Sequence, residues 1–229
     1  MRRLNPNLNS METVILGSTR IPRSQSRAFL ICGIAASVLY GLMLAFVPMF
    51  WEEYSSKTFT VSELSAIDAP TRSLWVPLGV FYTLLMIVFG YGVYVSAKGK
   101  RPLRIMAIAL LVNGVVSIYW PPMHLRGVGV TLTDTLHIVW SVITVVLMII
   151  AVIYGAKAFG KSFRHYSIIT LIILMVFGTL TGLESPAIPT NSPTPMIGIW
   201  ERISIGAYFL WIVVFSVTLL RTIPRPTQS

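Results

Sequence analysis

Charged residues are scarce in this chain. Asp, Glu, Lys and Arg together make up 11% of its 229 residues, whereas an average soluble domain contains about 25%. Hydrophobic residues make up 55%, and the mean hydropathy is +0.75. A soluble fold needs polar side chains to cover its surface, and this chain has too few of them. The composition therefore excludes a soluble globular protein and predicts that many apolar side chains face lipid.

Cysteine and the motifs of well-known enzymes are also rare or missing. The single cysteine, Cys32, lies in an apolar segment, so an intrachain disulfide and a zinc ribbon are excluded. The sequence contains no H-E-x-x-H or H-x-x-x-H zinc motif, no glycine-rich phosphate loop, no serine nucleophile elbow and no kinase signature. No motif therefore indicates a reaction.

Long apolar runs are what the chain has instead. An α-helix needs about 20 apolar residues to cross about 30 Å of hydrocarbon, and six runs approach that length: residues 28–50, 74–96, 103–120, 131–154, 166–183 and 199–220. The first run is longer than the apolar core of a cleavable signal peptide, which has about 7–15 residues. We therefore predict an all-α polytopic membrane protein with six transmembrane helices, in one domain over residues 28–220.

The charges predict how this domain is oriented. If the N-terminus is inside, every Lys and Arg falls on the cytoplasmic side except Lys57, Arg72, Arg126 and Arg202, and every acidic residue except Glu12 falls outside. Basic residues mark the cytoplasmic side of membrane proteins. The pattern predicts an N-in/C-in protein of a plasma (cell inner) membrane, with a basic cytoplasmic segment over residues 1–27 and a cytoplasmic tail over residues 221–229.

The net charge of +10 does not indicate nucleic-acid binding. That function needs basic residues on one face of a domain, whereas the basic residues here lie beside the ends of apolar runs. The partner expected from the sequence is the lipid bilayer, and protein partners stay unknown.

Two local patterns concern packing. Thr60-Val61-Ser62-Glu63 has the T-x-x-E form of a capping box, so we expect a short interfacial helix that ends near Pro70. Small residues, which allow membrane helices to approach closely, recur every four positions in two runs: Gly33, Ser37, Gly41 and Ala45 in the first, and Gly178 and Gly182 in the fifth. We interpret both sets as contacts inside one chain, with a homo-oligomer as the alternative.

Polar side chains inside the apolar runs predict one polar region. Such groups cost about 2.5–3.5 kcal/mol to insert when they are ionisable, so they face protein rather than lipid. Helical spacing puts three sets on single faces: Thr131, Asp134, His137, Ser141 and Thr144; Glu201, Ser204, Tyr208 and Trp211; and Asn113, Ser117 and Trp120. We expect an outward-facing pocket between the third, fourth and sixth helices, with a candidate outer polar cluster of His124, Arg126, Asp134, His137, Glu184, Glu201 and Arg202.

Three interpretations of this cluster stay open. His124, Asp134 and His137 have the ligand types of Zn²⁺, and Glu201 would then be the general base of a metal-dependent membrane hydrolase of lipid-like substrates. In a structural network, Asp134 would pair with His137 or Arg126, and Glu201 with a neighbouring arginine. A proton-coupled small-solute transporter needs polar residues deeper in the bundle, yet the fourth run is apolar from Thr144 to Tyr154.

Three motifs resemble one family. They are Val61 to Thr71, which reads VSELSAIDAPT; Met123 to Gly127, which reads MHLRG, with Asp134 and His137; and Trp200 to Gly206, which reads WERISIG, with Leu210-Trp211. Over about residues 25–220 the chain resembles the domain of unknown function 998 family of prokaryotic integral membrane proteins. The resemblance implies six helices and no established activity. We therefore expect a non-catalytic accessory, sensing or ligand-binding bundle, with the hydrolase and the transporter as alternatives.

Overall fold

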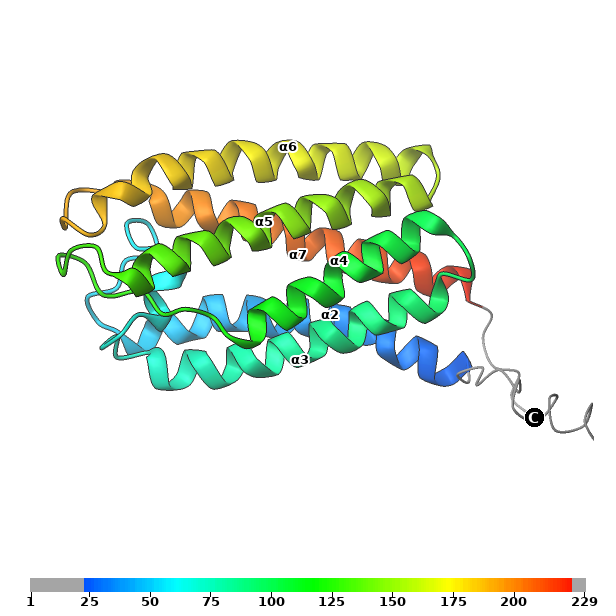
Figure 1. Ribbon diagram of the computed structural model, residues 1–229, viewed down its shortest axis with the longest axis horizontal. Helices are drawn as coiled ribbons and strands as arrows, with labels where there is room; N and C mark the ends of the chain where they lie inside the picture. Colours follow the sequence, from blue (N-terminus) through cyan, green and yellow to red (C-terminus); the bar gives the residue numbers. More distant parts are fainter. Residues whose placement is uncertain (1–22, 224–229) are drawn as a thin grey trace, which may run out of the picture.

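Six long helices make up most of the protein. The computed structural model describes residues 23–223 (Figure 1). The helices are α2 (Arg23–Phe46), α3 (Arg72–Ser96), α4 (Arg101–Ile118), α5 (Leu132–Ala158), α6 (Lys161–Glu184) and α7 (Ile197–Thr222), with 3₁₀ helices η1 (Val47–Phe50), η2 (Ser62–Ser65) and η3 (Ser185–Ala187).

All six long helices are long and apolar enough to cross a membrane, and the described residues form no β-strand. The predicted all-α fold with six membrane-spanning helices is therefore confirmed. The predicted segments 1–27 and 221–229 lie for the most part outside the described residues.

The six helices form a closed ring. Each helix packs against the next one in the sequence, and α7 also packs against α2, so that the last helix adjoins the first (Figure 1). Arg27 of α2 strengthens this closure, because its Nη1 donates to the carbonyls of Leu220 and Ile223 at 3.2 and 3.0 Å. A cation is favourable beside the free carbonyls at a helix C-terminus.

The two ends of the ring differ in their connections. At one end the helices are joined by residues 97–100 and 159–160 alone. Lys98 and Gly99 have positive φ angles of 43° and 84°, and Pro102 stands in the first turn of α4, so the chain reverses direction tightly there. The other end, on the left of Figure 1, carries the first loop (residues 51–71), the second loop (119–131) and the third loop (185–196).

Aromatic side chains fill the middle of the ring. Trp211 of α7 is fully buried and lies 5.3 Å from the ring of Phe215 and 5.9 Å from that of Phe163. Its Nε1 donates to Ser167 Oγ at 2.9 Å, which satisfies the indole in an apolar interior. A Cβ at Gly155 of α5 would stand 2.6 Å from the Trp211 ring. The absence of a side chain at Gly155 therefore allows α7 to contact α5 closely.

The small residues of α2 and α6 have different surroundings. A Cβ at Gly33 would lie 2.7 Å from Phe89 and 2.8 Å from Ser216, so the predicted close contact holds there. A Cβ at Gly41 or Gly182 would meet no described atom within 4 Å, and the predicted contact inside the chain is wrong at those two positions. Apolar side chains cover the outward faces of α5 and α6, among them Val142, Ile143, Val146, Ile169 and Ile172. These faces suit lipid.

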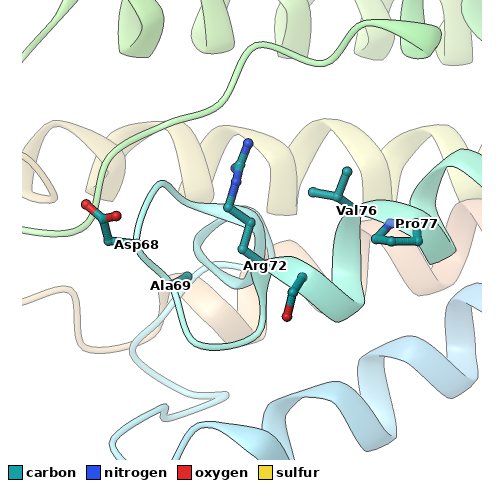
Figure 2. Close-up of a pocket in the computed structure, with 6 residues that line it drawn as sticks. Asp68, Ala69, Arg72, Val76 and Pro77 are labelled. Atoms are coloured by element: carbon teal, nitrogen blue, oxygen red, sulfur yellow. The ribbon is translucent and has the colours of Figure 1, made fainter.

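An open surface hollow lies at the head of α3. It has a volume of about 510 Å³, and its lining consists of Asp68, Ala69, Arg72, Ser73, Val76 and Pro77 (Figure 2). We call it the α3 cavity. It lies at the loop-rich end but contains none of the residues of the predicted outer polar cluster.

Candidate functional site

The first loop folds onto the loop-rich end of the ring. Its capping box is formed, because Glu63 N donates to Thr60 Oγ1 at 3.2 Å and Thr60 N donates to Glu63 Oε2 at 2.7 Å. A short helix is present there as η2, but the predicted end near Pro70 is wrong, because η2 is a 3₁₀ helix of four residues that ends at Ser65. Val61 and Leu64 pack with Met43 of α2 and Trp75 of α3. The loop therefore lies against the bundle rather than free in solvent.

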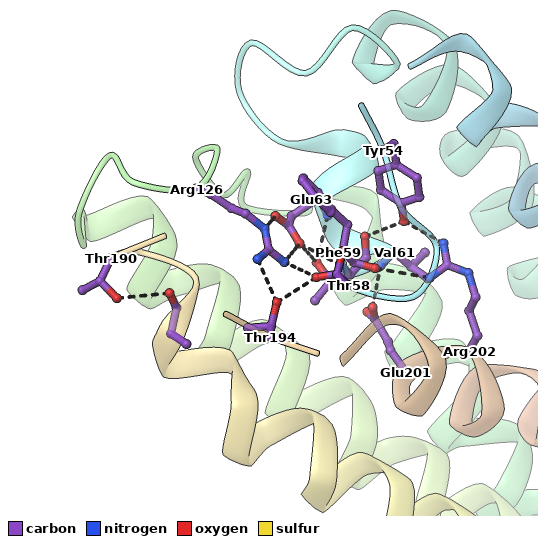
Figure 3. Close-up of polar contacts among 12 residues, drawn as sticks. Tyr54, Thr58, Phe59, Val61, Glu63, Arg126, Thr190, Thr194, Glu201 and Arg202 are labelled. Atoms are coloured by element: carbon purple, nitrogen blue, oxygen red, sulfur yellow. Dashed lines mark hydrogen bonds and ion pairs between the residues drawn. The ribbon is translucent and has the colours of Figure 1, made fainter. Parts of the chain in front are cut away.

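Glu63 and Arg126 form the central ion pair of this end. Arg126 Nε donates to Glu63 Oε1 at 2.6 Å, and Nη2 donates to Oε2 at 3.0 Å (Figure 3). The Glu63 side chain is 0% exposed and that of Arg126 is 11% exposed. Two parallel charge-assisted bonds fix both the distance and the orientation of the groups. A buried carboxylate also needs such a partner, because an unpaired charge there is very costly.

The remaining donors of Arg126 join the three loops. Nη1 donates to Thr194 Oγ1 of the third loop at 2.7 Å, and Nη2 donates to the Thr58 carbonyl of the first loop. Thr194 Oγ1 in turn donates to the same Thr58 carbonyl at 2.7 Å. The guanidinium carbon lies 4.3 Å from the ring centroid of Phe59, in cation–π contact. One arginine of the second loop therefore holds the first and third loops together.

Glu201 and Arg202, near the start of α7, bind the first loop. The Glu201 carboxylate accepts from Val61 N at 2.5 Å and from Ser62 Oγ at 3.4 Å. Arg202 Nη1 donates to the Ser56 carbonyl at 3.0 Å, and Nη2 donates to Tyr54 OH at 2.6 Å (Figure 3). The adjacent residues thus bind different parts of the same loop.

Tyr54 shows that this part of the first loop is shielded from water. Its hydroxyl donates to the Thr60 carbonyl at 2.8 Å and accepts from Arg202. Burial raises the pKa of Tyr54 to about 12, although the neighbouring Arg202 guanidinium acts in the opposite direction. The phenol is therefore a neutral structural donor at physiological pH.

His124 and Asp134 form a second pair at the start of α5, which is an ion pair when His124 is protonated. Asp134 Oδ1 accepts from His124 N at 2.7 Å, and Oδ2 lies 3.1 Å from His124 Nδ1. Thr131 and Asp134 also form a capping box, because Asp134 N donates to Thr131 Oγ1 at 3.4 Å and Thr131 N donates to Asp134 Oδ2 at 2.9 Å. One carboxylate therefore caps the helix and holds the second loop.

His137 and Glu184 have separate roles. His137 is buried one turn below Asp134, and its Nδ1 donates to the Pro121 carbonyl at 2.8 Å. Glu184, at the end of α6, accepts from Met196 N at 3.2 Å and from Trp200 Nε1 at 3.1 Å. Each side chain ties a loop backbone to a helix end.

The predicted outer polar cluster thus divides into separate contacts at the loop-rich end. The structural pairing considered from the sequence is wrong in its partners: among residues 23–223 the two ion pairs are His124–Asp134 and Arg126–Glu63. Helical neighbours Asp134 and His137 do not pair, because the second loop runs between α4 and α5 and offers each a nearer partner.

The metal site at His124, Asp134 and His137 stays a prediction. The structure places His124 beside Asp134, but His137 Nδ1 donates to the carbonyl of Pro121. Within the described part of the chain, no group of three or more His, Cys, Asp and Glu side chains is arranged to hold a metal ion.

Sequence reasoning missed the residues that matter most here. Glu63 was assigned only to a capping box, and Thr58 and Thr194 carried no signal at all. A buried arginine in a loop needs a carboxylate partner, so Arg126 alone indicates that an acidic residue lies beside it. Nothing in the spacing pointed to Glu63, which lies 63 residues away.

The comparisons with known proteins add a family and no activity. Residues 34–218 match the family model described as Protein of unknown function (DUF998). No curated protein and no solved structure matches the chain.

Proposed function

This chain belongs to the DUF998 family of proteins of unknown function, and we propose that it is a non-catalytic multi-pass protein of the plasma membrane. In this proposal it is an accessory or sensing bundle whose first loop presents a fixed surface outside the membrane. The contacts of Arg126 are the observation that supports this proposal most. Each of its three guanidinium nitrogens donates to the first or third loop. A group used in this way holds structure together rather than contacting a substrate.

The proposed orientation places the loop-rich end outside the cell. The opposite end carries a series of basic residues in or beside its short connections: Lys98, Lys100, Arg101, Arg104, Lys157, Lys161, Arg164 and Arg221. Basic residues in short loops favour the cytoplasmic side. Both chain termini would then be cytoplasmic, and the first loop would meet extracytoplasmic ligands or partners.

The first experiment separates this proposal from the hydrolase. Detergent-purified wild type, His124→Ala, Asp134→Ala and Glu63→Gln are compared by elemental analysis and by thermal unfolding. The proposal expects no stoichiometric transition metal and expects Glu63→Gln to lower the thermal stability most, because it breaks a buried ion pair. Near-stoichiometric zinc that is lost in His124→Ala and Asp134→Ala would overturn the proposal and favour the hydrolase.

A second experiment tests the orientation. In a Cys32→Ser background, which removes the one native cysteine, single cysteines are introduced as Glu52→Cys in the first loop and Lys98→Cys in a short connection. Both positions are exposed. A membrane-impermeant maleimide added to intact cells should label the first variant and not the second. The reverse pattern would contradict the proposed orientation.

A further inference from the structure

We propose that the α3 cavity binds the headgroup of a zwitterionic phospholipid from the leaflet at the loop-rich end. In this site the lipid phosphate would contact Arg72 and its ammonium group would contact Asp68. This binding site is separate from the network around Arg126 and does not depend on the function proposed for that network.

Two opposite charges stand in the lining without neutralising each other. Asp68 is exposed and has a φ of 66°, and Arg72 begins α3 four residues later. Neither residue belongs to the two ion pairs of residues 23–223. Arg72 Nη1 donates to the Ser65 carbonyl, so the side chain is held in place while its other nitrogens keep donors for a ligand. The cavity thus offers a fixed cation and a separate anion.

The lining changes from charged to apolar along α3. Figure 2 shows Asp68 at one end of the lining, Arg72 in its middle, and Val76 and Pro77 at the other end. At a rise of 1.5 Å per residue, Val76 lies about 6 Å farther along the helix than Arg72. Val80 follows one turn later and is 50% exposed. The polar end of the cavity therefore leads onto an apolar helix face in the direction of the bilayer.

Pro77 leaves one helix carbonyl near this surface without its usual donor. Proline has no backbone N–H, so the carbonyl of Ser73 loses the donor that position i+4 supplies in an ordinary helix. Ser73 lines the cavity. A helix carbonyl without its partner is costly near hydrocarbon. A ligand with N–H donors, such as an ethanolamine headgroup, would supply one.

These features match an amphiphile better than a soluble ion. The hollow is wide open to its surroundings, so a ligand there stays partly uncovered, as a lipid whose acyl chains remain in the bilayer would. A phosphate and an ammonium group fit the two charges, and acyl chains fit the exposed face of Val76, Val80 and Leu84. A phospholipid has all three parts in the same order.

The test uses native mass spectrometry of the full-length protein in detergent. The protein is equilibrated with equal amounts of phosphatidylethanolamine and phosphatidylglycerol that carry the same acyl chains, so the two lipids differ in the ammonium group. Wild type should retain the ethanolamine lipid preferentially. Asp68→Asn should reduce this preference by about two- to fivefold, as expected for one exposed charge pair. Arg72→Gln should reduce the retention of both lipids.

Matched controls keep the test interpretable. Glu52→Gln and Lys57→Gln remove the same charges from exposed positions of the first loop that do not line the cavity, and they should behave like wild type. Asn tolerates positive φ, so Asp68→Asn preserves the backbone and carries the test even if Arg72→Gln fails to fold. The proposal is overturned if wild type shows no preference, or if Asp68→Asn retains the wild-type preference.

A competition arm identifies the source of the headgroup. Free phosphoethanolamine has both charged groups but no acyl chains. If it displaces the bound lipid no better than an equal concentration of sodium chloride, the apolar face contributes and the lipid assignment is supported. If it displaces the lipid as well as added phosphatidylethanolamine does, the ligand is a soluble molecule and the lipid assignment is wrong.

Discussion

Replacing Arg126 by glutamine should be among the most damaging polar substitutions in this protein. The change removes both bonds to the fully buried Glu63, the bonds to Thr58 and Thr194, and the contact with Phe59. Breaking a buried ion pair by removing one partner costs about 3–5 kcal/mol, because the other charge stays buried without compensation. We expect a loss of that size in the free energy of unfolding.

A double-mutant cycle shows whether the loss comes from the pair. Glu63→Gln should also cost about 3–5 kcal/mol. The double variant leaves no buried charge, so its loss should be smaller than the sum of the single losses by about 1–3 kcal/mol. Arg126→Lys should lie between wild type and Arg126→Gln, because one ammonium group keeps the charge but not the two parallel bonds.

The assay is equilibrium unfolding in detergent micelles with added dodecyl sulfate, followed by the fluorescence of the six tryptophans. Lys57→Gln, an exposed charge of the same loop, is the control and should stay within about 0.5 kcal/mol of wild type. The reasoning is refuted if Arg126→Gln behaves like this control. Strict additivity of the two single losses would also refute it, because the buried pair would then contribute nothing as a unit.

Three further predictions concern other parts of the loop-rich end. Gly198→Ala places a Cβ in a clash with the Phe59 carbonyl and should cost about 1–3 kcal/mol in thermal unfolding. The control is Gly182→Ala, whose Cβ meets no described atom within 4 Å. Asp134→Ala removes the capping carboxylate of α5 and should cost about 0.5–2 kcal/mol in the same assay; equality with wild type would speak against the cap. Because the pKa of Tyr54 is raised to about 12, its neutral form contributes stability that is complete below pH 10 and is lost as the pH rises to about 12. Tyr54→Phe should lack this alkaline loss in unfolding measured from pH 9 to pH 12.

The membrane spans were predictable because they follow from local composition. A run of apolar residues long enough to cross a bilayer identifies a helix without knowledge of its neighbours. The structure places the spans within a few residues of the predicted ranges, for example Arg72–Ser96 against 74–96. Turn and capping patterns were equally local, which is why the Thr60–Glu63 capping box could be read from the sequence.

The contacts between loops were not predictable in the same way. Periodicity indicates which face of a helix is polar, but it does not say which loop side chain meets that face. In the structural interpretation of the cluster, Asp134 would pair with His137 or Arg126, whereas in the structure it contacts His124. Arg126 lies in the second loop and Glu63 in the first. The position of one loop relative to the other depends on how α2, α3 and α7 pack. Such pairs become visible only once the ring is assembled.

The closure of the ring between α2 and α7 has a consequence for biogenesis. Of the six described helices, ribosomes make α2 first and α7 last, so α2 gains α3 as a neighbour early but lacks its other neighbour, α7, until the four helices between them have been made. The bonds from Arg27 to Leu220 and Ile223 join positions 193 and 196 residues apart. Until α7 is inserted, the inner face of α2 and the underside of the first loop lack their partners. We therefore expect α7 to complete the surroundings of α2 late in assembly, and a chain interrupted before α7 to leave that face of α2 uncovered.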